Sequence, residues 1–99
     1  MRLTEDQARI IRETAQGIFG DHAKVRLFGS RIDDSQRGGD IDLLVECDAP
    51  VPDRLKKSLA LAARLQLALG DQPIDVLAID PQTSLQPVHK IAISTGIIL

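Results

Sequence analysis

The apolar segment at 41–46, IDLLVE, constrains the fold more than any other part of the sequence. Its nearly continuous run of branched side chains predicts a strand covered on both faces, and hence an interior strand of a sheet. The segment KVRLF at 24–28 alternates charged and apolar residues, which predicts a half-buried strand. Because only a short loop separates the two segments, we expect them to pair antiparallel.

Helical patterns flank these strands. Thr4 and Gln7 have the spacing of a capping box, ahead of a helix expected at Glu5–Phe19. A second helix is expected to end at Gly70 and to bury one apolar stripe. The stripe consists of Leu55, Leu59, Ala62, Leu65 or Gln66, and Leu69.

The last third of the chain predicts a strand, a helix and a final short strand. PIDVLAID at 73–80 has strand character and ends at an Asp-Pro turn signal. A short helix is expected at 85–94, with Val88, Ile91, Ala92 and Thr95 on one side, and TGIIL at 95–99 predicts the last strand. The predicted order is α-β-β-α-β-α-(β), a mixed α+β fold with a small sheet packed against helices, forming a single domain over residues 1–99.

Composition narrows the classes of partner. The formal net charge is -2 and the twelve Lys and Arg residues are scattered, which argues against direct nucleic-acid binding. A single cysteine excludes an intramolecular disulfide and fits a reducing compartment. The first residues indicate the start of a helix rather than a signal peptide, and no apolar run is long enough to span a bilayer. We therefore expect a cytoplasmic chain with no membrane partner.

Two acidic residues at the start of the segment 41–46 are the strongest functional signal. Asp40 and Asp42 point to the same face of a strand, and their mutual repulsion would destabilise the fold unless a cation offsets it. Magnesium prefers ligand sets of one or two carboxylates plus substrate phosphates. The Gly29-Ser30 turn, separated from Asp40 by a spacer of nine residues, could bring backbone N–H groups and a hydroxyl to a phosphate. A solvated strand end and an ordinary turn explain either pattern alone, but together they predict a nucleotide site.

A third carboxylate would complete a site for two metal ions. Asp75 and Asp80 are the candidates, and because they are five residues apart in a regular strand only one of them can face the pair. Asp75 lies inside the predicted strand, where a charge needs a reason, whereas Asp80 precedes a proline and is explained as a turn residue. We therefore favour Asp75.

The stretch FGSR…GGDIDLLVE resembles the signature of the DNA polymerase β-like nucleotidyltransferases, and within that superfamily the minimal nucleotidyltransferase (MNT) proteins of antitoxin type. The resemblance implies a nucleotidyltransferase fold in which Gly29 and Ser30, with Arg31 beside them, hold the phosphates of a nucleoside triphosphate. It also implies that Asp40 and Asp42 bind two magnesium ions, and that Asp75 binds one of them and orients or deprotonates the attacking hydroxyl. The loop between Ser30 and Asp40 is one residue shorter than the usual pattern and ends in two glycines.

The resemblance also implies a biological role. Proteins of this type pair with a HEPN-domain toxin encoded nearby, and some transfer AMP from ATP to a tyrosine of that toxin. Our first hypothesis is accordingly a magnesium-dependent protein adenylyltransferase that acts as an antitoxin in a hetero-oligomer. The second is a non-catalytic module that neutralises the toxin by stoichiometric contact, for which IAISTGIIL at 91–99 could form the interface. The third is a small-molecule nucleotidyltransferase, which would need a pocket completed by a further domain or a second copy.

Overall fold

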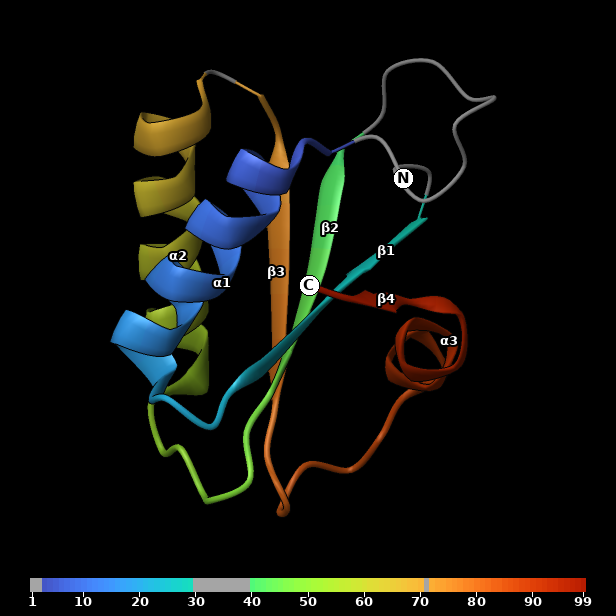
Figure 1. Ribbon diagram of the computed structural model, residues 1–99. Coiled ribbons are helices and arrows are strands. Elements are labelled where there is room, and N and C mark those ends of the chain that lie inside the picture. Colours follow the sequence, from blue (N-terminus) through green and yellow to red (C-terminus); the bar gives the residue numbers. More distant parts are fainter. Residues whose placement is uncertain (1–2, 30–39, 71) are drawn as a thin grey trace.

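The order of helices and strands follows the sequence pattern. The structure, a computed structural model, describes residues 3–29, 40–70 and 72–99. Over these residues the chain forms three helices and four strands in the order α-β-β-α-β-α-β, the mixed α+β class predicted above (Figure 1). The elements are α1 (Glu5–Phe19), β1 (Lys24–Phe28), β2 (Ile41–Glu46), α2 (Arg54–Leu69), β3 (Ile74–Ile79), α3 (Pro87–Thr95) and β4 (Ile97–Ile98).

The described strands form one mixed sheet in the order β3-β2-β1-β4. β1 and β2 pair antiparallel, as predicted, with Phe28 opposite Asp42. β2 and β3 run parallel, and their register places Asp42 opposite Asp75. The prediction that β2 is an interior strand is confirmed, which explains its apolar sequence, whereas β3 lies at one edge of the sheet.

Helices cover the two faces of the sheet unequally (Figure 1). α1 and α2 lie together on one face, and α3 lies on the other, where it packs mainly against β1 and β2. The larger core is formed between the sheet and the pair α1 and α2, mainly by Ile11, Ala15, Val25, Leu27, Ile41, Leu43, Val45, Leu61 and Leu65. A smaller core under α3 contains Leu44, Ile79 and Ala92. No helix in the described ranges combines the length and hydrophobicity that crossing a bilayer requires.

The boundaries of α1 are those predicted from its caps. The Gln7 backbone N–H donates to Thr4 Oγ1 at 3.1 Å, and the Thr4 N–H donates to Gln7 Oε1 at 3.0 Å. These two bonds form a complete capping box, which satisfies N–H groups that the first turn leaves without partners. Gly20 follows the last turn with a φ of 111°, and its N–H donates to Gln16 O at 2.9 Å.

The prediction for the buried side of α2 is wrong for its first two leucines. Leu55 and Leu59 are 74% and 64% exposed, and the buried stripe instead contains Ser58, Leu61 and Leu65. The helix is therefore rotated so that Leu55 and Leu59 lie along its flank, while Leu65 of the predicted stripe still packs in the core. Helical spacing alone does not show which side of α2 is buried, because the helix carries leucines on more than one side.

The prediction for α3 is also wrong in part. The helix starts at Pro87, two residues later than expected. Proline suits the first helical position, and Gln86 before it is the N-cap. Within the predicted stripe, Ala92 is buried, but Val88 and Ile91 are 43% and 57% exposed. The predicted final strand is present as β4, which pairs with β1 at the second edge of the sheet.

Candidate functional site

Three carboxylates meet at the end of the sheet where β2 and β3 begin. Asp42 and Asp75 lie opposite each other in the parallel register, so their side chains share the face that points away from α1 and α2. Asp40 precedes β2 and joins them, and one oxygen from each of the three residues lies within 4.8 Å of the others. The prediction that these side chains converge is confirmed, and metal binding by them stays a prediction.

Electrostatics at this cluster are unfavourable for Asp42. Burial raises the pKa of the Asp42 carboxyl above its ordinary value, and the nearby charges of Asp75 and then Asp40 raise it further. Asp42 is half-buried, whereas Asp40 and Asp75 are exposed. A carboxylate in this position gains most when a cation binds beside it, because the cation offsets both the lost hydration and the repulsion.

The raised pKa predicts that Asp42→Asn stabilises the metal-free protein at pH 7. A folded-state pKa above the unfolded value means that the free energy of unfolding falls as the pH rises through the window between the two values. Above that window Asp42 is ionised, so the free energy of unfolding stays lowered at neutral pH. Asparagine does not ionise, so the Asp42→Asn variant avoids this loss of stability. Urea unfolding in EDTA should therefore show a higher midpoint for Asp42→Asn than for the wild type.

The exposed Asp48 lies outside the cluster and supplies the matched control. Asp48→Asn should leave the midpoint within about 0.5 kcal/mol of the wild type, as surface substitutions usually do. Magnesium should raise the midpoint of the wild type and of Asp48→Asn but not that of Asp42→Asn. An unchanged or lower midpoint for Asp42→Asn in EDTA would contradict the electrostatic account.

The backbone at Gly29 lies directly against the carboxylate cluster. Gly29 follows the end of β1 and has a φ of 76°, in the left-handed region that favours glycine. A Cβ atom at this position would overlap Asp42 Oδ2 and lie 3.3 Å from Asp42 Cγ. The turn and the acidic strand are therefore adjacent in space as well as in sequence. Ser30 and Arg31, the other predicted phosphate ligands, lie outside the described residues.

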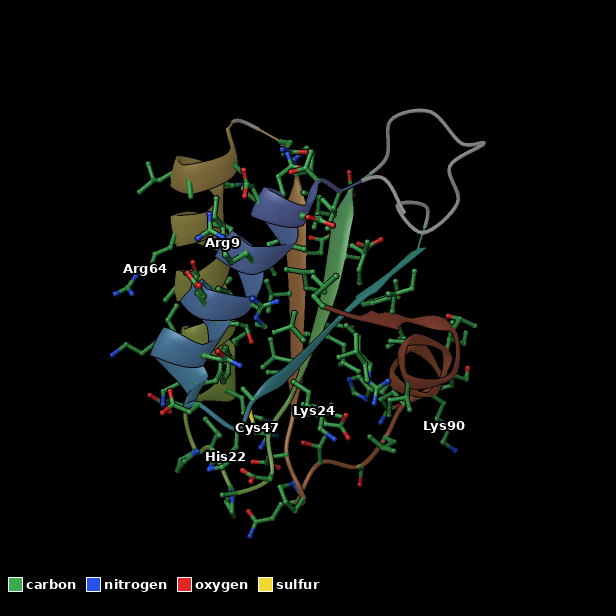
Figure 2. The ribbon with its side chains drawn as sticks, in the orientation of Figure 1. Arg9, His22, Lys24, Cys47, Arg64 and Lys90 are labelled. Carbon is green, nitrogen blue, oxygen red and sulfur yellow. The ribbon has the colours of Figure 1, made fainter. Side chains whose placement is uncertain are left out.

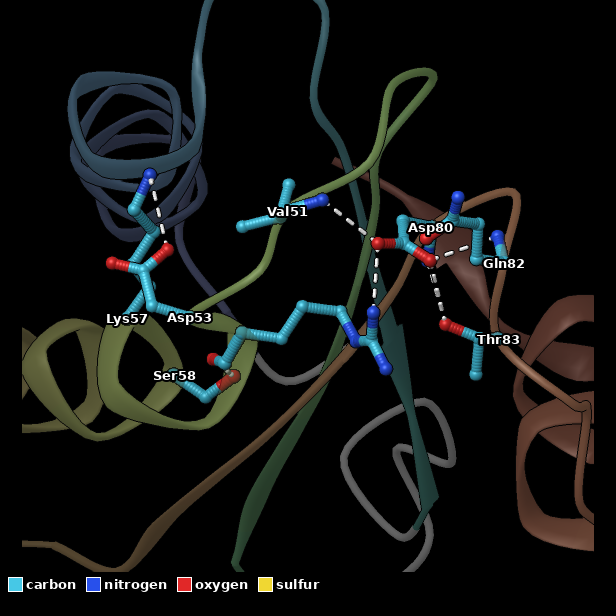
Figure 3. A network of polar contacts seen from close by, with 8 residues as sticks. Val51, Asp53, Lys57, Ser58, Asp80, Gln82 and Thr83 are labelled. Atoms are coloured by element: carbon cyan, nitrogen blue, oxygen red, sulfur yellow. Dashed lines mark hydrogen bonds and ion pairs between the residues drawn. The ribbon is translucent and has the colours of Figure 1, made fainter.

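Asp80 lies at the opposite end of β3 and is held in a network of its own (Figure 3). Its Oδ2 accepts hydrogen bonds from the Val51 N–H at 2.8 Å and from Arg54 Nη1 at 2.7 Å. Its Oδ1 accepts from the Gln82 N–H at 2.9 Å and from Thr83 Oγ1 at 3.1 Å. The preference for Asp75 over Asp80 as the third carboxylate agrees with this placement. The turn interpretation of Asp80 was incomplete, since the residue also ties the start of α2 to the end of β3.

This network predicts a stability component that is lost in acid. The hydrogen bond from the Val51 N–H is the main cause that lowers the pKa of Asp80 to about 2, with further bonds from Gln82, Arg54 and Thr83 overcoming the opposing effect of burial. A lowered pKa contributes stability above the ordinary value of 3.8, and that contribution is lost as the pH falls through about 2.

Asp80→Asn should therefore unfold at a lower urea concentration than the wild type at pH 7, and the difference should shrink between pH 3.8 and about 2. A series of urea midpoints from pH 7 to pH 2 measures this convergence. A difference that stays constant over the whole series would show that the charge of Asp80 is not its source.

A cleft of about 440 Å³ opens beside the carboxylate cluster. It runs along β3 and is bordered by α2 on one side and by the start of α3 on the other. The lining residues are Phe28, Asp42, Ser58, Leu59, Ala62, Ile74, Asp75, Val76, Leu77 and Val88. Sequence reasoning missed this cleft, although the apolar flank of α2 was a signal for it: Leu59 and Ala62 belong to the stripe that was assigned to the core.

The far end of the sheet offers no comparable chemistry among the described residues. Cys47, the single cysteine, lies there with His22 and Lys24 nearby in the view of Figure 2. Cys47 is buried, and this burial raises the pKa of its thiol, which disfavours the reactive thiolate form. A hollow of about 240 Å³ beside it is open and lined largely by the loops around 20–23 and 47–52. The carboxylate cluster is therefore the strongest candidate site.

No protein-family model matches the chain, and no curated protein matches it.

Proposed function

We propose that this chain is a magnesium-dependent nucleotidyltransferase that transfers AMP from ATP to a hydroxyl group of a partner protein. The observation that carries the proposal is the convergence of Asp40, Asp42 and Asp75 on one face, with the backbone of Gly29 against Asp42. Three carboxylates this close together repel one another, and that repulsion has to be offset. Metal ions bound with a triphosphate would offset it.

The residues present fit a magnesium site. Asp40 and Asp42 would hold two ions and Asp75 would share one of them, since the three side chains supply oxygen ligands from one face of the sheet. When bound, the ions would lower the pKa of the attacking hydroxyl and neutralise the charge that develops on the departing pyrophosphate. The raised pKa of Asp42 supports this assignment, because a cation would relieve the burial and repulsion that cause it.

In the proposed reaction each protein group near the cluster has a distinct part. Gly29, on the β1 side of the cluster with its backbone against Asp42, would lie beside the triphosphate. Asp75 lies on the edge strand and is exposed, so that it can accept the proton of an incoming hydroxyl. The hydroxyl oxygen bonds to the α-phosphorus, the bond from that phosphorus to the bridging oxygen breaks, and pyrophosphate leaves with the bonding electrons.

The sequence resemblance extends the proposal to the partner. The acceptor is a tyrosine or other hydroxyl-bearing residue of a HEPN-domain toxin encoded nearby, and the modification neutralises the toxin in a cytoplasmic hetero-oligomer. An open site suits a protein acceptor, because the partner brings its own surface to the reacting groups. The cleft beside Asp42 and Asp75 supports this, since it opens along the sheet edge.

Intact mass spectrometry tests the proposal directly. The chain is incubated with the purified protein encoded beside it and with Mg-ATP, and the partner is then weighed. The expected result is a gain of one or more AMP groups on the partner that disappears when EDTA replaces magnesium. A partner of unchanged mass in all samples would overturn the transfer reaction.

A non-catalytic role is the second candidate, and one observation favours it. The side chains of Val88, Ile91, Ile97 and Ile98 on α3 and β4 are all between 38% and 57% exposed, although the segment is strongly apolar. Such a surface could bind the toxin by contact alone. In that case Asp42→Asn would neutralise the toxin as well as the wild type does.

A further inference from the structure

β3 is a long edge strand with an open side. It spans six residues, Ile74–Ile79, and pairs only with β2 in the described sheet. The opposite edge is formed by β4, which has only two residues. Proteins usually protect an edge of this length with charges, bulges or a covering element, because its free backbone groups can pair with another chain. Here the cleft beside the carboxylate cluster runs along that edge instead.

The backbone of β3 shows which groups are free. The Ile41 N–H donates to Pro73 O at 3.0 Å, and the Cys47 N–H donates to Ile79 O at 2.9 Å. In a parallel ladder every second residue directs both its N–H and its C=O to the same neighbour. The odd-numbered residues of β3 therefore face β2, and the N–H and C=O groups of Val76 and Ala78 point away from the sheet.

Two apolar walls flank this edge on opposite faces of the sheet. One wall consists of Leu59 and Ala62 of α2. The other consists of Leu77 of β3 and Val88 of α3. Successive side chains of an extended peptide also point to opposite faces. A strand added to β3 would therefore place alternate side chains against the two walls, while its backbone pairs with Val76 and Ala78.

The charges along the cleft limit its occupant. Asp42 and Asp75 are the charged residues of its lining, and both lie at the end where β2 and β3 begin. Acidic side chains are disfavoured at that end by repulsion, and charged side chains elsewhere would lose hydration without gaining a partner. A second copy of this chain fits less well, because its own β3 would bring a further exposed carboxylate, Asp75, to an edge whose described lining contains no positive charge.

From these features we infer that β3 is the docking edge for the acceptor, which binds as an extended, largely apolar segment that adds a strand to the sheet. The segment carries its hydroxyl-bearing residue at the acidic end, beside Asp75. The inference rests on the proposed function for the fate of that hydroxyl, but the docking itself needs neither metal ions nor ATP. It deepens the proposal by naming the conformation in which the acceptor is recognised.

A peptide library tests the docking separately from transfer. Displayed 12-residue peptides with a central tyrosine are panned against the full chain in EDTA, and an enriched peptide is then synthesised with a fluorescent label. Its Kd is measured by fluorescence polarisation for the wild type, Leu59→Lys and Leu67→Lys. Both leucines are exposed on α2, at 64% and 88%, but only Leu59 lines the cleft.

The Kd should rise at least about tenfold for Leu59→Lys, because the lysine charge would have to be desolvated in the cleft, and change less than about twofold for Leu67→Lys. Amide hydrogen exchange followed by NMR should slow at Val76 and Ala78 when the peptide binds, and stay unchanged at Leu77, which already pairs with β2. Failure to enrich any peptide would overturn the inference. So would equal binding by both lysine variants, or slowed exchange at Val76 that depends on protein concentration without peptide.

The outcomes for docking and for transfer are distinguishable. If the peptide binds as described but the partner never gains AMP, the docking inference stands and the proposed function fails. If the partner gains AMP at the same rate with Leu59→Lys as with the wild type, the proposed function stands and the docking inference fails.

Discussion

Asp42→Asn should slow AMP transfer to the partner protein by at least about 100-fold, the usual scale for losing one group that stabilises charge in a transition state. Asp42 is the central member of the carboxylate cluster: it lies opposite Asp75 in the sheet, two residues after Asp40, and against Gly29. The asparagine keeps the size of the side chain but removes the charge that a metal ion needs. Because the same variant is expected to be more stable in EDTA, the loss of transfer cannot be assigned to unfolding.

The measurement is the initial rate of AMP addition to the partner, followed by intact mass with Mg-ATP in excess. Asp48→Asn is the matched control, since Asp48 lies on the same segment of chain but is exposed and outside the cluster. It should transfer at the wild-type rate. A rate for Asp42→Asn within a few-fold of the wild type would exclude Asp42 from the metal site and favour the non-catalytic binding role.

Gly29→Ala should abolish the stabilisation of the protein by magnesium and lower its stability in EDTA. An alanine in the left-handed region costs about 1–2 kcal/mol. In addition, its Cβ would overlap Asp42 Oδ2, so the carboxylate would have to move out of the cluster. The backbone and the metal ligand are thus disturbed by a single added methyl group.

Gly20→Ala separates these two effects. Gly20 also has a positive φ, 111°, but a Cβ at that position meets nothing within 4 Å. Both variants should therefore unfold at lower urea concentrations than the wild type, and only Gly29→Ala should lose the increase that magnesium produces. A normal response of Gly29→Ala to magnesium would show that Asp42 does not need the position it occupies in this structure.

Local patterns in the sequence predicted the elements well where the signal was itself local. The capping box at Thr4 and Gln7 placed the start of α1, and the apolar run of β2 identified the interior strand. The same reasoning failed for the orientation of α2, because Leu55 and Leu59 have helical spacing but lie on the flank of the helix. Part of this flank borders the cleft, so Leu59, which the sequence assigned to the core, belongs to the proposed docking surface.

What the sequence by itself determined is the periodicity of each element: the order of helices and strands, the shared face of Asp40 and Asp42, and the fact that Asp75 and Asp80 cannot both join them. These properties depend on backbone geometry over a few residues. Only the tertiary structure decided that β3 runs parallel to β2 with Asp75 opposite Asp42, and that α2 leaves the edge of β3 open. Register and helix rotation depend on packing between segments far apart in the chain, which no local pattern encodes.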